Sequence, residues 1–94
     1  MYIRLTRAQL DPSTYAVTAP LRTELAAAVR AMPGCQRYEQ AASRKTGSFI
    51  TIGAFDTEEH ANYPRERLAD ILARLQANGL GQLQPSELYE VLGP

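Results

Sequence analysis

The sequence predicts an α+β domain whose elements follow the order β-α-β-β-α-β. Three observations indicate this order. Two helix-periodic segments alternate with four strand-like segments, each helix-periodic segment ends at a turn that contains glycine, and residues 49–55 are apolar at nearly every position. The chain has 94 residues, which suits one domain over residues 1–94, because domains typically hold about 100–150 residues.

The first strand and first helix are predicted from alternation, capping and periodicity. Residues 2–7 alternate in character and include β-branched and aromatic side chains, as strands do. Asp11 supplies a possible cap and Pro12 suits the first helical position. Apolar residues recur at helical spacing over residues 21–32, and a Pro-Gly pair ends the helix. We expect a kink or a loose first turn at Pro20, since proline disrupts a helix interior.

The next two strands are predicted to form a hairpin. Residues 36–40 form the second strand, and residues 44–47 (Arg-Lys-Thr-Gly) connect it to the third. Residues 49–55 are the strongest strand of the chain. Their nearly continuous apolar character is typical of a central strand that is covered on both faces.

The second helix is predicted to begin after the third strand. Asp56 is expected to cap it while Glu59 reaches back, as in a capping box. Apolar residues form one stripe over residues 61–75, with Pro64 near the beginning and an Asn-Gly pair at the end. Residues 87–92 alternate and form the fourth strand.

These elements predict how the sheet is covered. Two β-α-β units in one sheet require right-handed crossovers, which gives a ferredoxin-like sandwich with both helices on one face. The other face has no helix, yet residues 49–55 are too apolar to leave it in water. We therefore expect a second copy to dock there, so that a homodimer forms a dimeric α/β barrel.

Composition argues against several function classes. Ten basic and ten acidic residues give a net charge of zero, unlike the basic surface of a nucleic-acid binder. Cys35 is the one cysteine of the sequence and forms no internal disulfide. One cysteine and one histidine are too few ligands for a zinc or iron–sulfur site, so no metal is expected. No signal segment or membrane-length apolar run is evident, so we expect a cytoplasmic protein without membrane contact.

Three short motifs lie where elements meet: residues 32–34 (Met-Pro-Gly), 54–56 (Ala-Phe-Asp) and 57–61 (Thr-Glu-Glu-His-Ala). They resemble the helix-to-strand turn, the aromatic strand end and the acidic helix start of antibiotic biosynthesis monooxygenase domains, which are dimeric α/β barrels. The resemblance covers almost the whole chain. It implies oxidation of a small aromatic substrate, polyketide- or quinol-like, with O₂ and without a cofactor. The haem-degrading branch of the family places an asparagine on the first strand and a histidine on the second helix. Here residues 2–7 contain no asparagine and the second half of the second helix contains no histidine, so that branch is not expected.

A candidate site is predicted at the starts of the two helices. We expect the first and third strands to run parallel, so that both helices begin at the same end of the sheet. Tyr15 then approaches His60, Asn62 and Tyr63, and two helix N-termini there favour a developing negative charge. His60 would be the catalytic base, because histidine exchanges protons near neutral pH. Asn62 and Tyr63 would bind the substrate oxygen, and Tyr15 would orient the substrate.

Structural interpretations of the same residues remain open. His60 suits a solvated position in an acidic helix turn, Asn62 and Tyr63 suit the break before a proline, and Tyr15 suits packing. Four charged strand residues are expected to pair across strands: Arg4, Arg7, Arg37 and Glu39.

Two other functions share this element order. An RNA-binding domain carries aromatic side chains on its third strand, but here only Phe49 fits, while Gly47 and Ile52 occupy positions that need stacking rings. The stronger alternative is a barrel that binds a small apolar ligand without catalysis, or a stress-responsive barrel. Several family enzymes line the pocket with a tryptophan, and this sequence has none. That absence, and the solvated position that suits His60 equally well, favour the alternative.

Overall fold

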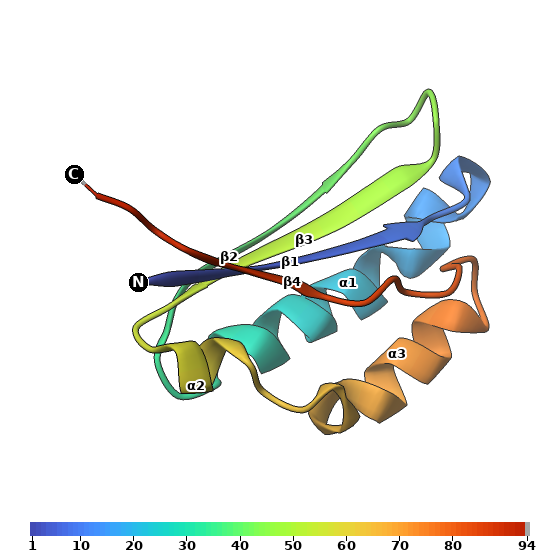
Figure 1. The fold of residues 1–94 in the computed structure, drawn as a ribbon. Helices are drawn as coiled ribbons and strands as arrows, with labels where there is room; N and C mark the ends of the chain where they lie inside the picture. Colours follow the sequence, from blue (N-terminus) through green and yellow to red (C-terminus); the bar gives the residue numbers. More distant parts are fainter. Residues whose placement is uncertain (94) are drawn as a thin grey trace.

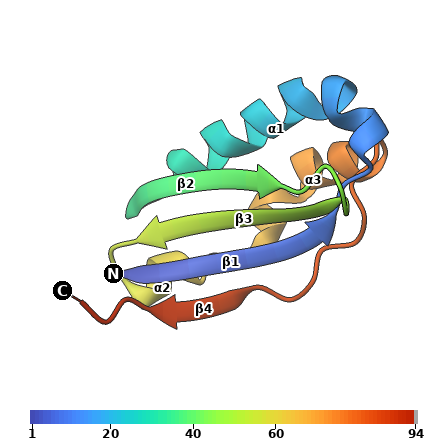
Figure 2. The same ribbon diagram turned by 90° about the horizontal axis from the view of Figure 1, so that it is seen from above.

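The strands form one antiparallel sheet. In the computed structural model, which describes residues 1–93, the strand order is β2-β3-β1-β4 (Figure 2). Every neighbouring pair is antiparallel, which confirms the ferredoxin-like α+β fold. The strands are β1 (Tyr2–Gln9), β2 (Cys35–Ala42), β3 (Ser48–Phe55) and β4 (Glu87–Glu90).

The helices all lie on one face of the sheet, as predicted (Figure 1). Among residues 1–93, none of these helices has both the length and the apolar character that crossing a bilayer requires. The helices are α1 (Tyr15–Arg30), α2 (Glu58–Ala61) and α3 (Ala69–Gln76), with 3₁₀ turns η1 (Pro12–Thr14) and η2 (Arg65–Leu68) before α1 and α3.

The first helix follows its sequence signals closely. Asp11 Oδ1 accepts a hydrogen bond from the Ser13 amide at 3.0 Å, which confirms the predicted cap. The irregular first turn is η1, upstream of Pro20, and α1 continues through that proline as one helix. Because proline has no amide hydrogen, the helix lacks one backbone hydrogen bond at this point.

The second helical segment is broken, and here the prediction of one continuous helix was wrong. α2 is a single turn that ends at Ala61, and Pro64 is extended with φ −66° and ψ 132° before η2 and α3 begin. Proline removes a donor and keeps the preceding residue out of the helical region, so the chain cannot continue the turn. The cap also differs, because Thr57 Oγ1, rather than Asp56, accepts the amide of His60 at 3.1 Å.

The core lies between the sheet and the helices, and the opposite face carries a second apolar surface. Phe55, Leu10, Val29 and Leu75 are at most 1% exposed within the core. Along each strand, the side chains point alternately towards this core and towards the opposite face of the sheet. No described helix covers that opposite face, which we call the open sheet face (Figure 1). Its apolar residues are Ile3, Leu5, Ile50, Ile52, Ala54 and Tyr89.

Candidate functional site

The strand directions separate the residues that were predicted to cluster. β1 and β3 are antiparallel, so the prediction that they run parallel was wrong. The hairpin between β2 and β3 reverses the chain after the first crossover. As a result, α1 begins at one end of the sheet and α2 at the other (Figure 1). Tyr15 therefore does not join His60, Asn62 and Tyr63.

Tyr15 lies beneath two arginines at its own end of the sheet. The guanidinium carbons of Arg22 and Arg44 are 5.7 and 4.9 Å from the centre of its ring. Its hydroxyl is buried and has no hydrogen-bond partner among residues 1–93. This arrangement indicates packing rather than contact with a substrate at His60.

His60, Asn62 and Tyr63 do lie together, in a surface hollow at the end of the sheet where α2 begins. His60 Nδ1 is 2.6 Å from Asp56 Oδ1, and this hydrogen bond is the main cause that lowers the pKa of Asp56. This contact orients the imidazole ring through Nδ1. The other ring nitrogen, Nε2, is left to take part in a proton transfer. The hollow, the His60 hollow below, is lined by Met32, Pro33, Glu59, His60, Asn62, Tyr63, Pro64 and Arg67.

A second, interior cavity lies between the sheet and the helices. Its volume is about 30 Å³, which holds about two water molecules. Sequence reasoning selected only Tyr63 among its residues. The walls are apolar and aromatic with a few polar side chains, from Arg4, Thr6, Leu25, Val29, Tyr38, Phe49, Thr51, Tyr63, Arg65, Leu68, Leu72, Leu80 and Leu83.

Arg4 is the buried cation of this cavity, and only 8% of the residue is exposed. Its Nη1 donates to the carbonyl oxygens of Ala61 at 3.2 Å and Tyr63 at 2.6 Å, and its guanidinium carbon is 3.8 Å from the centre of the Tyr63 ring. These carbonyls face Arg4 where α2 ends and the chain extends towards Pro64. Burial lowers the pKa of Arg4, an effect opposed by the charge interaction with Tyr63.

Two tyrosines supply neutral hydroxyls to the cavity. Burial is the main cause that raises the pKa of Tyr38 to about 12, and its hydroxyl accepts a hydrogen bond from Gln40 Nε2 at 3.3 Å. Burial also raises the pKa of Tyr63. Both phenols therefore stay protonated at neutral pH and act as hydrogen-bond donors. No aspartate, glutamate or histidine is found among the described residues that line the cavity.

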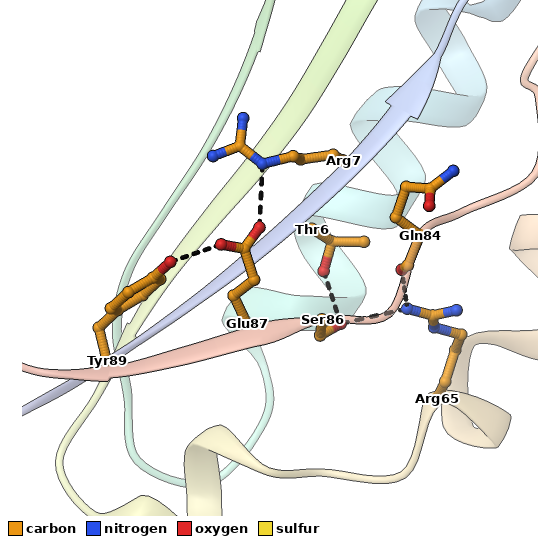
Figure 3. A network of polar contacts seen from close by, with 7 residues as sticks. All are labelled: Thr6, Arg7, Arg65, Gln84, Ser86, Glu87 and Tyr89. Carbon is orange, nitrogen blue, oxygen red and sulfur yellow. Dashed lines mark hydrogen bonds and ion pairs between the residues drawn. The ribbon is translucent and has the colours of Figure 1, made fainter.

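A polar network holds the rim of the cavity near the start of β4 (Figure 3). Arg65 Nη2 donates to the carbonyl oxygen of Gln84 at 2.8 Å and to Ser86 Oγ at 3.1 Å, and Ser86 Oγ is 2.8 Å from Thr6 Oγ1. Arg65 and Leu83 also line a hollow on the outer surface, which indicates the side from which a ligand would enter.

The open sheet face carries its own charged pair, seen in the same view. Arg7 Nε donates to Glu87 Oε2 at 2.9 Å, and the Tyr89 hydroxyl donates to the other oxygen of Glu87 (Figure 3). Arg7 thus pairs across strands as predicted. Arg37 and Glu39 pair within β2 instead, and Arg4 pairs with no carboxylate among residues 1–93, so these two expectations were wrong.

No cation site is evident, since residues 1–93 contain no group of three histidine, cysteine, aspartate or glutamate side chains placed to hold a metal ion. The Pro-Gly turn next to the His60 hollow has a steric reason. Gly34 has φ 76°, and a Cβ atom there would collide with Asp56 Oδ1 and His60 Nδ1. Only glycine allows the turn to approach this pair so closely.

Comparison with known proteins finds likeness in structure alone. No protein-family model and no curated protein matches the sequence. A crystal structure of an antibiotic biosynthesis monooxygenase is 18% identical, with a TM-score of 0.72 over 99% of this chain and 100% of that chain. SnoaB, a cofactor-independent oxygenase from Streptomyces nogalater, is 16% identical, with a TM-score of 0.72 over 99% and 94% of the two chains.

A third similar structure contains a bound molecule. The monooxygenase from the gene ActVA-Orf6 of Streptomyces coelicolor, in complex with the ligand nanaomycin D, is 18% identical, with a TM-score of 0.74 over 99% of this chain and 88% of that chain. At such identities the likeness concerns the fold. The fold that the three sequence motifs implied is confirmed.

Proposed function

We propose that this chain, which has the fold of antibiotic biosynthesis monooxygenases, is a cofactor-independent monooxygenase that acts with O₂ on a small aromatic substrate. The observation that carries the proposal is the interior cavity, with apolar and aromatic walls and polar side chains that are mostly hydrogen-bond donors. Two proteins of similar fold, SnoaB and the ActVA-Orf6 protein, are described as an oxygenase and a monooxygenase, which supports the same chemistry here.

The reaction that suits these residues passes through a substrate anion. A ring CH₂ group next to a carbonyl loses a proton, and the carbanion then gives electrons to O₂ to form a carbon–oxygen bond. The O–O bond breaks, the second C–H proton leaves, and the products are a ring carbonyl and water. Arg4 donates a hydrogen bond to the anionic oxygen and Tyr38 to another acceptor of the substrate, while the apolar walls exclude water.

His60 is the proposed base for the first proton transfer. It lines the His60 hollow rather than the interior cavity, and Tyr63 lines both. The substrate would therefore lie against Tyr63 with its acidic carbon towards the hollow. Asn62, also in the hollow, would hold a second substrate oxygen.

Oxygen consumption tests this proposal. Anthrone-like and quinol-like substrates are supplied to the protein without added metal or flavin. Wild type is expected to consume O₂, and H60A to lose about 100-fold in rate, because general acid–base catalysis contributes about 10²–10⁴-fold. K45A, which changes an exposed residue of the β2–β3 turn, serves as the control. Unchanged turnover in H60A would remove His60 from the mechanism.

A second function is favoured by one specific observation. The described lining of the interior cavity contains donors and apolar groups but no carboxylate or imidazole, as expected of a site that binds a small ligand without reacting it. Ligand binding without O₂ uptake across the substrate panel would support this non-catalytic function.

The partner that we propose is a second copy of the chain. The open sheet face is apolar at its centre, and two ion pairs flank it, Arg7–Glu87 and Arg37–Glu39. A self-complementary surface of this kind suits two-fold pairing, in which each arginine can meet a glutamate of the other copy. The cytoplasmic location stays a prediction.

A further inference from the structure

We propose that Arg4 makes the interior cavity selective for ligands that carry an acidic oxygen and bind as monoanions, namely aromatic phenolates, enolates or carboxylates. The inference rests on the proposed function for its choice of cavity and adds the charge of the ligand to it. It also applies if the cavity binds a ligand without catalysis.

The first argument is the missing counter-charge. Arg7, Arg37 and Arg74 all pair with carboxylates at exposed positions. Arg4 is buried, yet its polar contacts among the described residues are two peptide carbonyls and the Tyr63 ring. A buried charge without an opposite charge is strongly destabilising, so a protein that keeps one has a use for it. An anionic ligand supplies the missing charge.

The second argument is an unused donor. Arg4 Nε is buried and has no hydrogen-bond partner among residues 1–93. The great majority of buried donors are paired, so an orphaned one next to a cavity marks where a ligand atom fits. Arg65, the other cation of the lining, donates to Gln84 and Ser86, which leaves Arg4 as the better anion site.

The third argument is the row of side chains across the sheet. Arg4 on β1 is in register with Gly53 on β3, and Gly53 is in register with Tyr38 on β2. Gly53 adds no side chain between the other two, and the Phe55 ring covers it, since a Cβ atom there would lie 2.8 Å from Phe55 Cε2. Arg4 and Tyr38 both line the cavity, from backbone positions about 10 Å apart, two strand spacings. A charged donor and a neutral donor from two different strands suit a ring that carries an anionic oxygen and a second acceptor.

The cavity volume of about 30 Å³ sets the choice of probe. A large polycyclic molecule requires the rim at Arg65 and Leu83 to move, whereas a single ring requires less movement. We choose 4-nitrophenol, whose visible absorption distinguishes phenol from phenolate, and 4-nitroanisole as its neutral counterpart. Neither probe consumes O₂, and the titrations are done under argon, so binding is measured apart from activity.

The expected result is a downward shift of the pKa of bound 4-nitrophenol. Burial in an apolar cavity alone raises the pKa of a phenol, as it does for Tyr38, whereas a guanidinium lowers it. The Tyr63 phenol keeps a raised pKa beside Arg4, because it meets the guanidinium with its ring and burial is the larger effect. A probe oxygen that accepts directly from Arg4 Nε is expected to have a lowered pKa, so the sign of the shift shows whether that contact forms. R4M is expected to weaken phenolate binding at least tenfold and to reverse the sign, while R4K keeps most of the effect. K45M, which changes an exposed residue of the β2–β3 turn, is expected to bind like wild type.

Several outcomes would overturn the inference: a raised pKa of the probe in wild type, 4-nitroanisole binding as tightly as the phenolate, or no binding of either probe. If R4M fails to fold, as judged by circular dichroism, the sign in wild type and the R4K titration still decide. Anion binding without O₂ uptake would keep this inference and remove the proposed oxygenase. O₂ uptake together with equal affinity for neutral and anionic ligands would keep the proposed oxygenase and remove this inference.

Discussion

At the scale of single residues, the contrast between Arg4 and His60 shows how burial assigns roles. The His60 side chain is 39% exposed and hydrogen-bonds the Asp56 carboxylate, so it has both a partner and contact with water. Arg4 is buried without such a partner and is therefore the residue from which a ligand gains most. Gly34 lies against the Asp56–His60 pair and fixes its position.

Replacement of Gly34 tests that fixed position. G34A is expected to lower the free energy of unfolding by about 1–2 kcal/mol, because φ is 76° and a left-handed backbone disfavours a Cβ atom. Urea unfolding measures the change. G93A, where a Cβ atom meets only Val91 at 3.9 Å, should leave stability unchanged. Equal effects of the two substitutions would show that the Gly34 turn is not constrained.

The Asp56–His60 contact predicts a pH dependence of stability. The folded pKa of Asp56 is below its ordinary value of 3.8, so the contact stabilises the fold above that value and is lost as pH falls through the lowered pKa. D56N should therefore be less stable than wild type at pH 6, and the difference should shrink towards pH 2. Urea midpoints across this range measure it, with E66Q as an exposed control. A difference that is constant with pH would contradict the assignment.

At the scale of elements, two prolines act differently because of where they lie in their helical segments. Pro64 follows a single turn and stops it, which turns the carbonyl oxygens of Ala61 and Tyr63 towards Arg4. Pro20 lies inside α1, and that helix continues on both sides of it. The break at Pro64 thus builds part of the cavity, while Pro20 only removes a hydrogen bond.

Substitution of Pro20 should therefore stabilise the protein. P20A restores a helical amide at an exposed position. The gain is partly offset because alanine gives the unfolded chain more conformational entropy than proline does. The net effect is expected to be a rise of about 1–2 kcal/mol in the free energy of unfolding. P12A is the matched control, because a proline at the start of η1 displaces no hydrogen-bonded amide. A loss of stability in P20A would mean that the proline packs or bends the helix in a required way.

Several features that depend on residues close together in the sequence were predicted correctly, whereas some that depend on distant residues were not. The Asp11 cap, the turn at Gly34 and the strand over residues 49–55 depend on local chemistry, and the structure confirms them. The placement of Tyr15 failed because strand direction depends on the hairpin between β2 and β3, which the topological argument did not follow through.

The interior cavity was missed for a different reason. Arg4 meets Ala61 and Tyr63 across 57 and 59 positions of sequence, a contact that no local pattern reveals. A weaker signal did exist, because Arg4 shares the inward-facing positions of its strand with Thr6 and Ala8. A charged residue in such a row is a candidate for a site.

At the scale of the whole molecule, the sheet has two faces with different tasks. One packs against the helices and encloses the cavity, and the other is apolar and is covered by no helix of residues 1–93 (Figure 1). Ile3, Leu5 and Ile52 lie near the centre of the open sheet face and are half-buried in the single chain, and an apolar surface of this kind favours association. The barrel that two such sheets form would keep both cavities facing outward.

Light scattering after size exclusion tests this pairing. Wild type at micromolar concentration should have twice the mass of one chain, and I52K should have the mass of one chain, because a buried lysine opposes association. V17K changes an exposed residue of α1, 57% accessible, and should remain dimeric. A wild-type monomer would refute the pairing.

The central claim is that a ligand occupies the space between sheet and helices, at Arg4 and Tyr63. A crystal structure with bound 4-nitrophenolate tests it most directly. We predict the phenolate oxygen within hydrogen-bond distance of Arg4 Nε and the ring along the apolar wall of Leu25, Val29 and Leu72. A ligand seated in the His60 hollow alone, with Arg4 Nε still unpaired, would contradict the account.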